Sequence, residues 1–250
     1  MDIEKAIEKF IQYTEEYDLN DENIKRKQTH SIRVMNRSKE IAQKLNLTQE
    51  EIDLATLIGL LHDIARFEQY KQYHTYRDDL SIDHGDLGVE ILNKDIRKYI
   101  ETDKYDETIK LAVKNHNKYK IQEDLSQEQK IFAQIIRDAD KIDIYYDSAE
   151  NYYKGREYML EETNITPEVL EQFENYTNVN GKTKRTLIDE IVSRMAFIYD
   201  FNFDMSFEIL KKEDYINKTL NRFQMKDLKD QKNLEKIRNI ANEYINSKIK

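Results

Sequence analysis

The sequence contains no cysteine, and only one proline and five glycines occur in its 250 residues. Without cysteine, disulfide bonds and thiolate metal ligands are excluded, so any metal ion must be held by histidine and carboxylate side chains. Sheets and hairpins need more turn residues than one proline and five glycines provide. We therefore expect an all-α fold.

Long apolar runs are also missing. No stretch approaches 18 uncharged apolar residues, so the sequence predicts no membrane span. The first ten residues, MDIEKAIEKF, are amphipathic and lack the apolar run of a signal peptide, which makes the cytoplasm the expected location. The 49 acidic and 40 basic residues give a net charge of −9, which argues against a broad nucleic-acid or membrane surface. A small anionic substrate in a local pocket remains compatible with this charge.

Apolar periodicity predicts a series of helices in the first 148 residues. The pattern from Thr48 to Glu51 is a capping box, and it opens a segment that is apolar on every face and ends near His62-Asp63. Such a segment is typical of a buried helix. Residues 67–83 lack periodicity and are predicted to form a loop. The other predicted helices cover residues 2–16, roughly 22–46, a short segment from Asp83, 104–116 and roughly 126–147.

The character of the chain changes near residue 148. Residues 148–163 are rich in tyrosine and glutamate, and no histidine occurs beyond this point. Helices are predicted over roughly 183–200, 205–222 and 227–247. We interpret residues 1–148 as one domain and residues 149–250 as a helical cap packed on it, or as a dimerisation element that would make a homodimer.

Six polar residues fall at core-facing positions of the predicted helices or at helix starts: His30, His62, Asp63, His84, His116 and Asp140. Each alone is more often a hydrogen-bonded core residue or a cap than a ligand. Together, four histidines and two aspartates suit Fe, Mn, Co, Ni or Zn. The set is too large for one ion with an open position, so we predict two ions bridged by Asp63. One ion would be held by His30, His62, Asp63 and Asp140, and the other by Asp63, His84 and His116.

These residues stand in a recognisable context. The motifs are THSIRV around His30, LLHDIARF around His62-Asp63 and IIRDADKID around Asp140. In order and spacing they resemble the four-part signature of the HD superfamily of metal-dependent phosphohydrolases. The histidines in DHGDLGVEIL and KNHNK are similar to those of its dinuclear subset. The resemblance covers roughly residues 22–148 and implies an HD-domain helical bundle, with the C-terminal region as an additional helical cap.

Three basic residues are candidates for binding the substrate. The resemblance implies that Arg66, three residues after Asp63, faces the substrate phosphate, and a planar guanidinium suits phosphate oxygens. A surface arginine paired with Glu68 or Asp79 is the alternative. Arg33 lies one helical turn after His30, and Lys141 follows Asp140 directly. For both, a solvated side chain is an equally good interpretation.

Three functions fit these observations. The first is hydrolysis of a phosphate ester or anhydride, by a phosphomonoesterase or phosphodiesterase acting on a nucleotide or another small phosphorylated metabolite. In this reaction a metal-activated hydroxide attacks phosphorus, Asp63 bridges the two metal ions, and Arg66 neutralises the negative charge that develops on the phosphate. The second is an HD-type di-iron oxygenase. The third is a non-catalytic nucleotide-binding sensor, whose C-terminal helices pass a signal to a partner.

Overall fold

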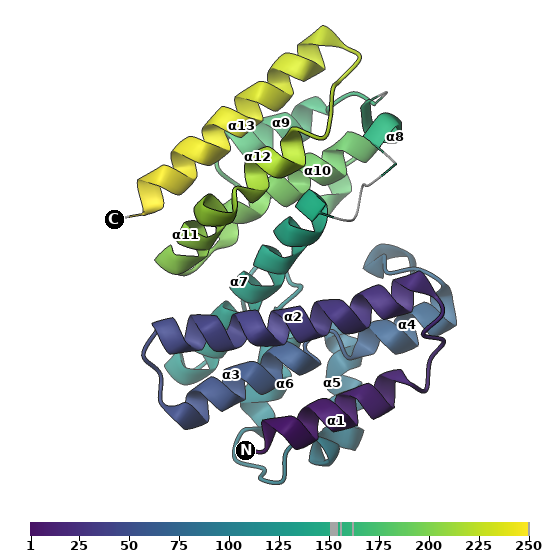
Figure 1. Ribbon diagram of the computed structural model, residues 1–250, viewed down its shortest axis with the longest axis vertical. Coiled ribbons are helices and arrows are strands. Elements are labelled where there is room, and N and C mark those ends of the chain that lie inside the picture. Colours follow the sequence, from purple (N-terminus) through teal and green to yellow (C-terminus); the bar gives the residue numbers. More distant parts are fainter. Residues whose placement is uncertain (151–154, 156, 162, 250) are drawn as a thin grey trace. The chain divides into compact units, whose positions relative to one another are not determined.

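The computed structural model describes residues 1–150, 155, 157–161 and 163–249. Every regular element in this part of the chain is a helix, which confirms the predicted all-α class (Figure 1). The chain divides into two compact units, Met1–Asp140 and Lys141–Lys250. Within the described ranges, none of the helices combines the length and the apolar character needed to cross a bilayer.

The N-terminal unit is built around two neighbouring helices, α2 (Glu22–Lys44) and α3 (Gln49–Leu61), which pack against each other (Figure 1). The predicted capping box opens α3, because the Thr48 hydroxyl accepts the Glu51 N–H and the Glu51 carboxylate accepts the Thr48 N–H. From Leu54 onward every residue of α3 is buried, as expected for a helix that is apolar on all faces. The remaining helices of this unit are α1 (Ile3–Thr14), α4 (Ala65–Tyr73), α5 (His84–Asp95), α6 (Asp106–Asn115) and the first part of α7 (Gln127–Glu150).

A glycine allows α2 and α3 to approach closely. A Cβ atom on Gly59 would lie 2.6 Å from the Ser38 hydroxyl oxygen and 2.8 Å from Met35 Cα. Both distances are below van der Waals contact, so any larger residue would push the two helices apart. This close approach matters because α2 carries His30 and His62 directly follows α3.

The prediction of a loop over residues 67–83 is wrong for its first part, because α4 covers Ala65–Tyr73. Its helical pattern was hard to see because the buried residues are chemically mixed. Phe67 is fully buried against the rings of Phe10 and Tyr13, with centroid distances of 5.9 Å to each, whereas the buried Gln69 makes polar contacts. The helix ends at His74, which adopts a left-handed conformation with φ of 52°. A short 3₁₀ turn, Asp78–Leu80, interrupts the loop that follows.

The C-terminal unit contains further helices: α8 (Glu157–Glu161), α9 (Pro167–Glu174), α10 (Leu187–Met195), α11 (Asp204–Glu213), α12 (Tyr215–Leu220) and α13 (Leu228–Lys248). The prediction of one helix over 205–222 is wrong, because Asp214, with φ of 56°, separates α11 from α12. The helix predicted over 183–200 is α-helical only from Leu187 to Met195, because the Thr186–Asp189 capping box starts it late. The segment 148–163 lies partly outside the described residues, and a cap role for 149–250 stays a prediction.

Candidate metal centre

The six residues predicted as metal ligands come from five helices of the N-terminal unit. His30 lies in the middle of α2, and His62 and Asp63 directly follow α3. His84 is the first residue of α5, His116 follows the last residue of α6, and Asp140 lies on α7. Five of the six are buried, and Asp140 is the most exposed, with 16% of its side chain accessible. Three helix ends and the middle of two helices, α2 and α7, thus bring these polar side chains together.

Four of these side chains form a first group. His30 Nε2 lies 3.2 Å from His62 Nε2, 3.2 Å from Asp140 Oδ1 and 3.4 Å from Asp63 Oδ2. His62 Nε2 lies 3.6 Å from Asp63 Oδ2 and 3.8 Å from Asp140 Oδ1. The ligand atoms of His30, His62 and Asp140 lie within 4.8 Å of one another, an arrangement that could hold a metal ion, and Asp63 Oδ2 lies beside both histidine nitrogens.

A second group surrounds the other oxygen of Asp63. His84 Nε2 and His116 Nε2 are 2.9 Å apart and lie 3.4 and 3.5 Å from Asp63 Oδ1. Asp63 thus presents one oxygen to each group, as a bridging carboxylate would. His62 lies between the groups, since it also offers a ligand atom within 4.8 Å of those of Asp63 and His116.

In His62, His84 and His116, the ring nitrogen Nδ1 lies within hydrogen-bond distance of an oxygen atom. His62 Nδ1 lies 2.8 Å from the Gly59 carbonyl oxygen, and His116 Nδ1 lies 2.5 Å from the Val113 carbonyl oxygen. A carbonyl oxygen only accepts, so both Nδ1 atoms carry the proton and donate. The Nε2 atom of a neutral histidine in this tautomer has a free lone pair, which is the form that binds a metal.

His84 is oriented by a carboxylate that the sequence analysis did not identify. His84 Nδ1 lies 2.6 Å from Asp78 Oδ2, in the loop after α4. The buried Gln69 donates to Asp78 Oδ1, at 2.9 Å, and Asn117 donates to Asp78 Oδ2, at 3.2 Å. A carboxylate that holds a ligand histidine fixes its tautomer and raises its basicity. Only the fold reveals Asp78, because nothing in the local pattern of residues 74–83 distinguishes it from Asp79.

Burial keeps His62 and His84 neutral. It lowers the pKa of His62 to about 3, and burial together with the Arg66 guanidinium lowers the pKa of His84 to about 4. Burial alone would raise the pKa of Asp63 and Asp140. The Lys27 ammonium beside Asp63, and the hydrogen bond from His30 to Asp140, outweigh it and hold both carboxyl pKa values well below their ordinary range. Neutral imidazoles and ionised carboxylates are the protonation states of metal ligands, so the donor set fits a divalent cation.

A lysine that the sequence analysis missed also reaches this centre. Lys27 Nζ lies 2.7 Å from Asp63 Oδ2, and 17% of the lysine side chain is exposed. Lys27 precedes His30 by three residues on α2, so the two side chains share a face of the helix. Arg33 has the same one-turn relation to His30, so the spacing in the sequence also indicates Lys27.

Arg66, one of the three residues predicted to bind the substrate, lies beside Asp63 at the candidate metal centre. Its Nε lies 3.5 Å from Asp63 Oδ1, and its Nη1 donates to Asp78 Oδ1, at 3.0 Å, so its acidic partners differ from the Glu68 or Asp79 of the alternative interpretation. Arg33 is half-buried on α2. Lys141 belongs to the C-terminal unit, where its Nζ lies 2.7 Å from Asp200 Oδ2. Substrate contacts of these three residues stay predictions.

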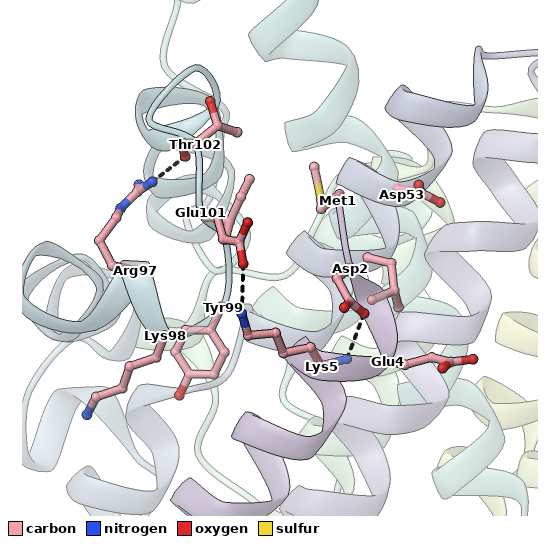
Figure 2. Close-up of a pocket in the computed structure, with 12 residues that line it drawn as sticks. Met1, Asp2, Glu4, Lys5, Asp53, Arg97, Lys98, Tyr99, Glu101 and Thr102 are labelled. Carbon is pink, nitrogen blue, oxygen red and sulfur yellow. Dashed lines mark hydrogen bonds and ion pairs between the residues drawn. The ribbon is translucent and has the colours of Figure 1, made fainter.

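A cavity of about 640 Å³ lies elsewhere in the N-terminal unit, between the start of α1 and residues 97–102 (Figure 2). None of the six histidines and aspartates lines it. Charges of both signs surround it, and Lys5 forms an ion pair with Glu101 at 2.7 Å. This balance of charge gives the cavity no preference for an anionic ligand.

Comparison with known families agrees with the geometry. Residues 28–145 match the model of the HD domain family. This part of the chain belongs to the HD superfamily of metal-dependent phosphohydrolases, whose domains bind divalent metals and act on small phosphorylated substrates. No curated protein sequence and no solved structure matches the chain.

Proposed function

We propose that this HD domain hydrolyses a phosphate ester or anhydride of a small metabolite, such as a nucleotide, with two divalent ions bound at the candidate metal centre. In this proposal His30, His62, Asp63 and Asp140 hold one ion, and Asp63, His84 and His116 hold the other. Asp63, with one oxygen directed at each group, is the bridge. Water adds to phosphorus, the bond from phosphorus to the leaving oxygen breaks, and the proton that water gives up is taken by the leaving oxygen or by solvent.

One observation carries the proposal. His84 Nε2 and His116 Nε2 lie 2.9 Å apart, although the Nδ1 atom of each ring already donates to an oxygen acceptor. Two lone pairs at this distance repel each other unless a cation lies beside them. A buried carboxylate oxygen, Asp63 Oδ1, stands 3.4 to 3.5 Å from both nitrogens and completes a set of ligands.

The chain's own residues supply the rest of the chemistry. A bound divalent ion would supply Lewis acidity, which lowers the pKa of water and offsets phosphate charge. Arg66 has an Nε–H group without a hydrogen-bond acceptor among the described residues, and this group is directed at Asp63. We propose that this N–H group stabilises the negative charge that develops on the phosphoryl oxygens during hydrolysis. The buried surroundings of His62 and His84 keep both rings neutral and available as ligands.

The test is elemental analysis of the purified protein, combined with hydrolysis of a panel of phosphomonoesters, phosphodiesters and nucleotides. We expect two ions per chain and hydrolysis with manganese or cobalt in the absence of oxygen, which an oxygenase could not perform. The His84→Ala variant should retain fewer ions and lose activity. His74→Ala is the matched control, because His74 is exposed at the end of α4.

Two results would count against the proposal. Metal-loaded protein that cleaves no member of the panel would leave the nucleotide-sensor or oxygenase functions as the better ones. One ion per chain, unchanged in His84→Ala, would remove the second site and leave the first group alone as the metal centre.

A further inference from the structure

Two basic side chains stand on either side of Asp63. Lys27 Nζ lies 2.7 Å from Asp63 Oδ2, and Arg66 Nε lies 3.5 Å from Asp63 Oδ1. Lys27 comes from α2 and Arg66 from α4, so two separate helices direct positive charge at the same carboxylate. Each carboxylate oxygen therefore faces both a pair of histidines and one basic side chain.

An aromatic residue aligns the two cations. The ring centroid of Tyr76 lies 5.5 Å from Lys27 Nζ and 5.7 Å from Arg66 Cζ, within the range of cation–π attraction. The backbone carbonyl of Tyr76 accepts a hydrogen bond from Arg66 Nη1, at 2.7 Å, and its hydroxyl donates to the Asn23 carbonyl, at 3.0 Å. Tyr76 is thereby fixed to α2 at one end and to Arg66 at the other, and acts as a positioning residue for both cations.

The two cations are partly accessible to solvent. The side chains of Lys27 and Arg66 are 17% and 14% exposed, whereas His62, Asp63 and His116 are 3% exposed or less. Solvent therefore reaches the ammonium and guanidinium groups, as it also reaches the Asp140 carboxylate, which is 16% exposed.

The charges at the centre favour a strongly anionic ligand. Three carboxylates contact its histidines, from Asp63, Asp78 and Asp140, and Lys27 and Arg66 offset two of these negative charges. One divalent ion already makes the whole group net positive, and a second ion makes it more so. Such a group prefers the dianionic phosphate of a monoester, or the terminal phosphate of an anhydride, to the monoanionic phosphate of a diester.

Resting on the proposed hydrolase function, we propose that Lys27 is a substrate-binding residue that pairs with Arg66, both aligned by Tyr76, to select a terminal dianionic phosphoryl group over a phosphodiester. Lysine binds phosphate as a compact point charge, whereas arginine adds directional donors, so the two side chains complement each other. Removing Lys27 weakens the binding of a dianion more than that of a monoanion.

The first measurement needs no catalysis. Inorganic phosphate is titrated calorimetrically into the metal-loaded protein and into its Lys27→Gln and Lys25→Gln variants. Lys25 is an exposed residue of the same helix, so its variant removes the same charge from the surface. Loss of one charge-assisted contact should weaken phosphate binding by about 10- to 100-fold in Lys27→Gln. We expect a change within about twofold in Lys25→Gln, where only a screened surface charge is lost, and Lys27→Arg should recover most of the affinity.

The second measurement compares two substrates, p-nitrophenyl phosphate and bis(p-nitrophenyl) phosphate. In Lys27→Gln, kcat/KM for the monoester should fall about tenfold more than kcat/KM for the diester, because the second negative charge is lost as a recognition element. Tyr76→Leu keeps Lys27 but removes the aligning ring, and should shift the same ratio in the same direction. If Lys27→Gln does not fold, Tyr76→Leu decides the question.

Three outcomes would overturn the inference: equal losses for the two substrates, unchanged phosphate affinity in Lys27→Gln, or loss of bound metal together with phosphate binding. The last would mean that Lys27 supports the ligands instead of the substrate. Wild-type protein that binds phosphate but cleaves neither substrate would contradict the proposed hydrolase function alone, since the titration still tests Lys27.

Discussion

The two units bury carboxylates in opposite surroundings. In the C-terminal unit, the fully buried Asp189 accepts hydrogen bonds from the backbone of Thr166, Arg185 and Thr186 and from the Thr166 hydroxyl, at 2.6 to 3.0 Å. In the N-terminal unit, the buried Asp63 faces the Nε2 atoms of four histidines, at 3.4 to 3.6 Å. The first carboxylate is satisfied by donors of its own unit, whereas the second stands among further potential ligand atoms.

This difference separates structural from functional burial of polar groups. A buried polar group is stable when donors and acceptors pair, and Asp189 is paired completely by the fold. A cluster rich in lone pairs is costly unless a cation joins it. Burial by itself therefore does not distinguish a functional carboxylate from a structural one in this protein. The balance of hydrogen-bond donors and acceptors around the carboxylate does.

The largest effect should follow from Asp63→Ala. Losing the carboxylate shared by both groups removes a ligand from each. Hydrolysis of the best panel substrate should fall by at least about 10⁴-fold, as expected when one member of a catalytic unit is removed, and bound metal should be lost. Activity assays and elemental analysis measure both quantities. Retained metal at the wild-type level would contradict the bridging role.

The stability of the metal-free protein should fall steeply between pH 6.5 and 5. The pKa values of His62 and His84 are lowered from the ordinary 6.5 to about 3 and about 4. In this window the unfolded chain binds protons that the folded chain does not, so each histidine should cost about 1.4 kcal/mol per pH unit as the pH falls, or about 4 kcal/mol for both at pH 5. Urea unfolding in the presence of a chelator measures this loss.

The comparison with the C-terminal unit sharpens this pH prediction. The pKa of Asp189 is lowered from 3.8, since its hydrogen bonds outweigh its burial, so its contribution to stability is lost only below about pH 4. His62→Gln should roughly halve the slope between pH 6.5 and 5, and His74→Gln should leave it unchanged. A flat stability profile from pH 7 to 5 would show that the buried histidines are protonated in the folded protein.

Asp189→Ala should destabilise the protein without affecting its metal content. It leaves three backbone N–H groups and one hydroxyl without their acceptor, which should lower the free energy of unfolding by about 2–4 kcal/mol. Glu190→Ala is the neighbouring control, with an exposed carboxylate and an expected change within about 0.5 kcal/mol. If folded Asp189→Ala protein lost its metal, Asp189 would not have the purely structural role that separates it from Asp63.

The smallest effect is expected for Asp78→Asn. An amide accepts the His84 Nδ1–H bond less strongly than a carboxylate, so metal affinity should fall by about 10- to 100-fold while the fold is kept. Competition with a chelating dye measures the affinity. Asp79→Asn alters the neighbouring carboxylate, which pairs with Arg77 on the surface, and should bind metal as the wild type does.

Sequence patterns located most of the helices of the N-terminal unit and the residues that converge at its centre. Helices α2 and α13 begin and end within two residues of the predicted ranges, because their apolar periodicity and caps are local features. Helix α4 was missed because its buried face mixes Phe67 with Gln69, and the break at Asp214 was missed because the apolar pattern continues across it.

The sequence by itself determined the helical class, through its shortage of glycine and proline, and the six histidines and aspartates, through their order and context. Only the tertiary structure decided which other groups reach them. Lys27 meets Asp63 across 36 residues, and Asp78 turns towards His84 from a loop without periodicity. Contacts between distant segments depend on how helices pack, and local spacing does not encode them. For that reason the structure, and not the sequence, revealed Lys27, the basic residue that we propose binds the substrate phosphate.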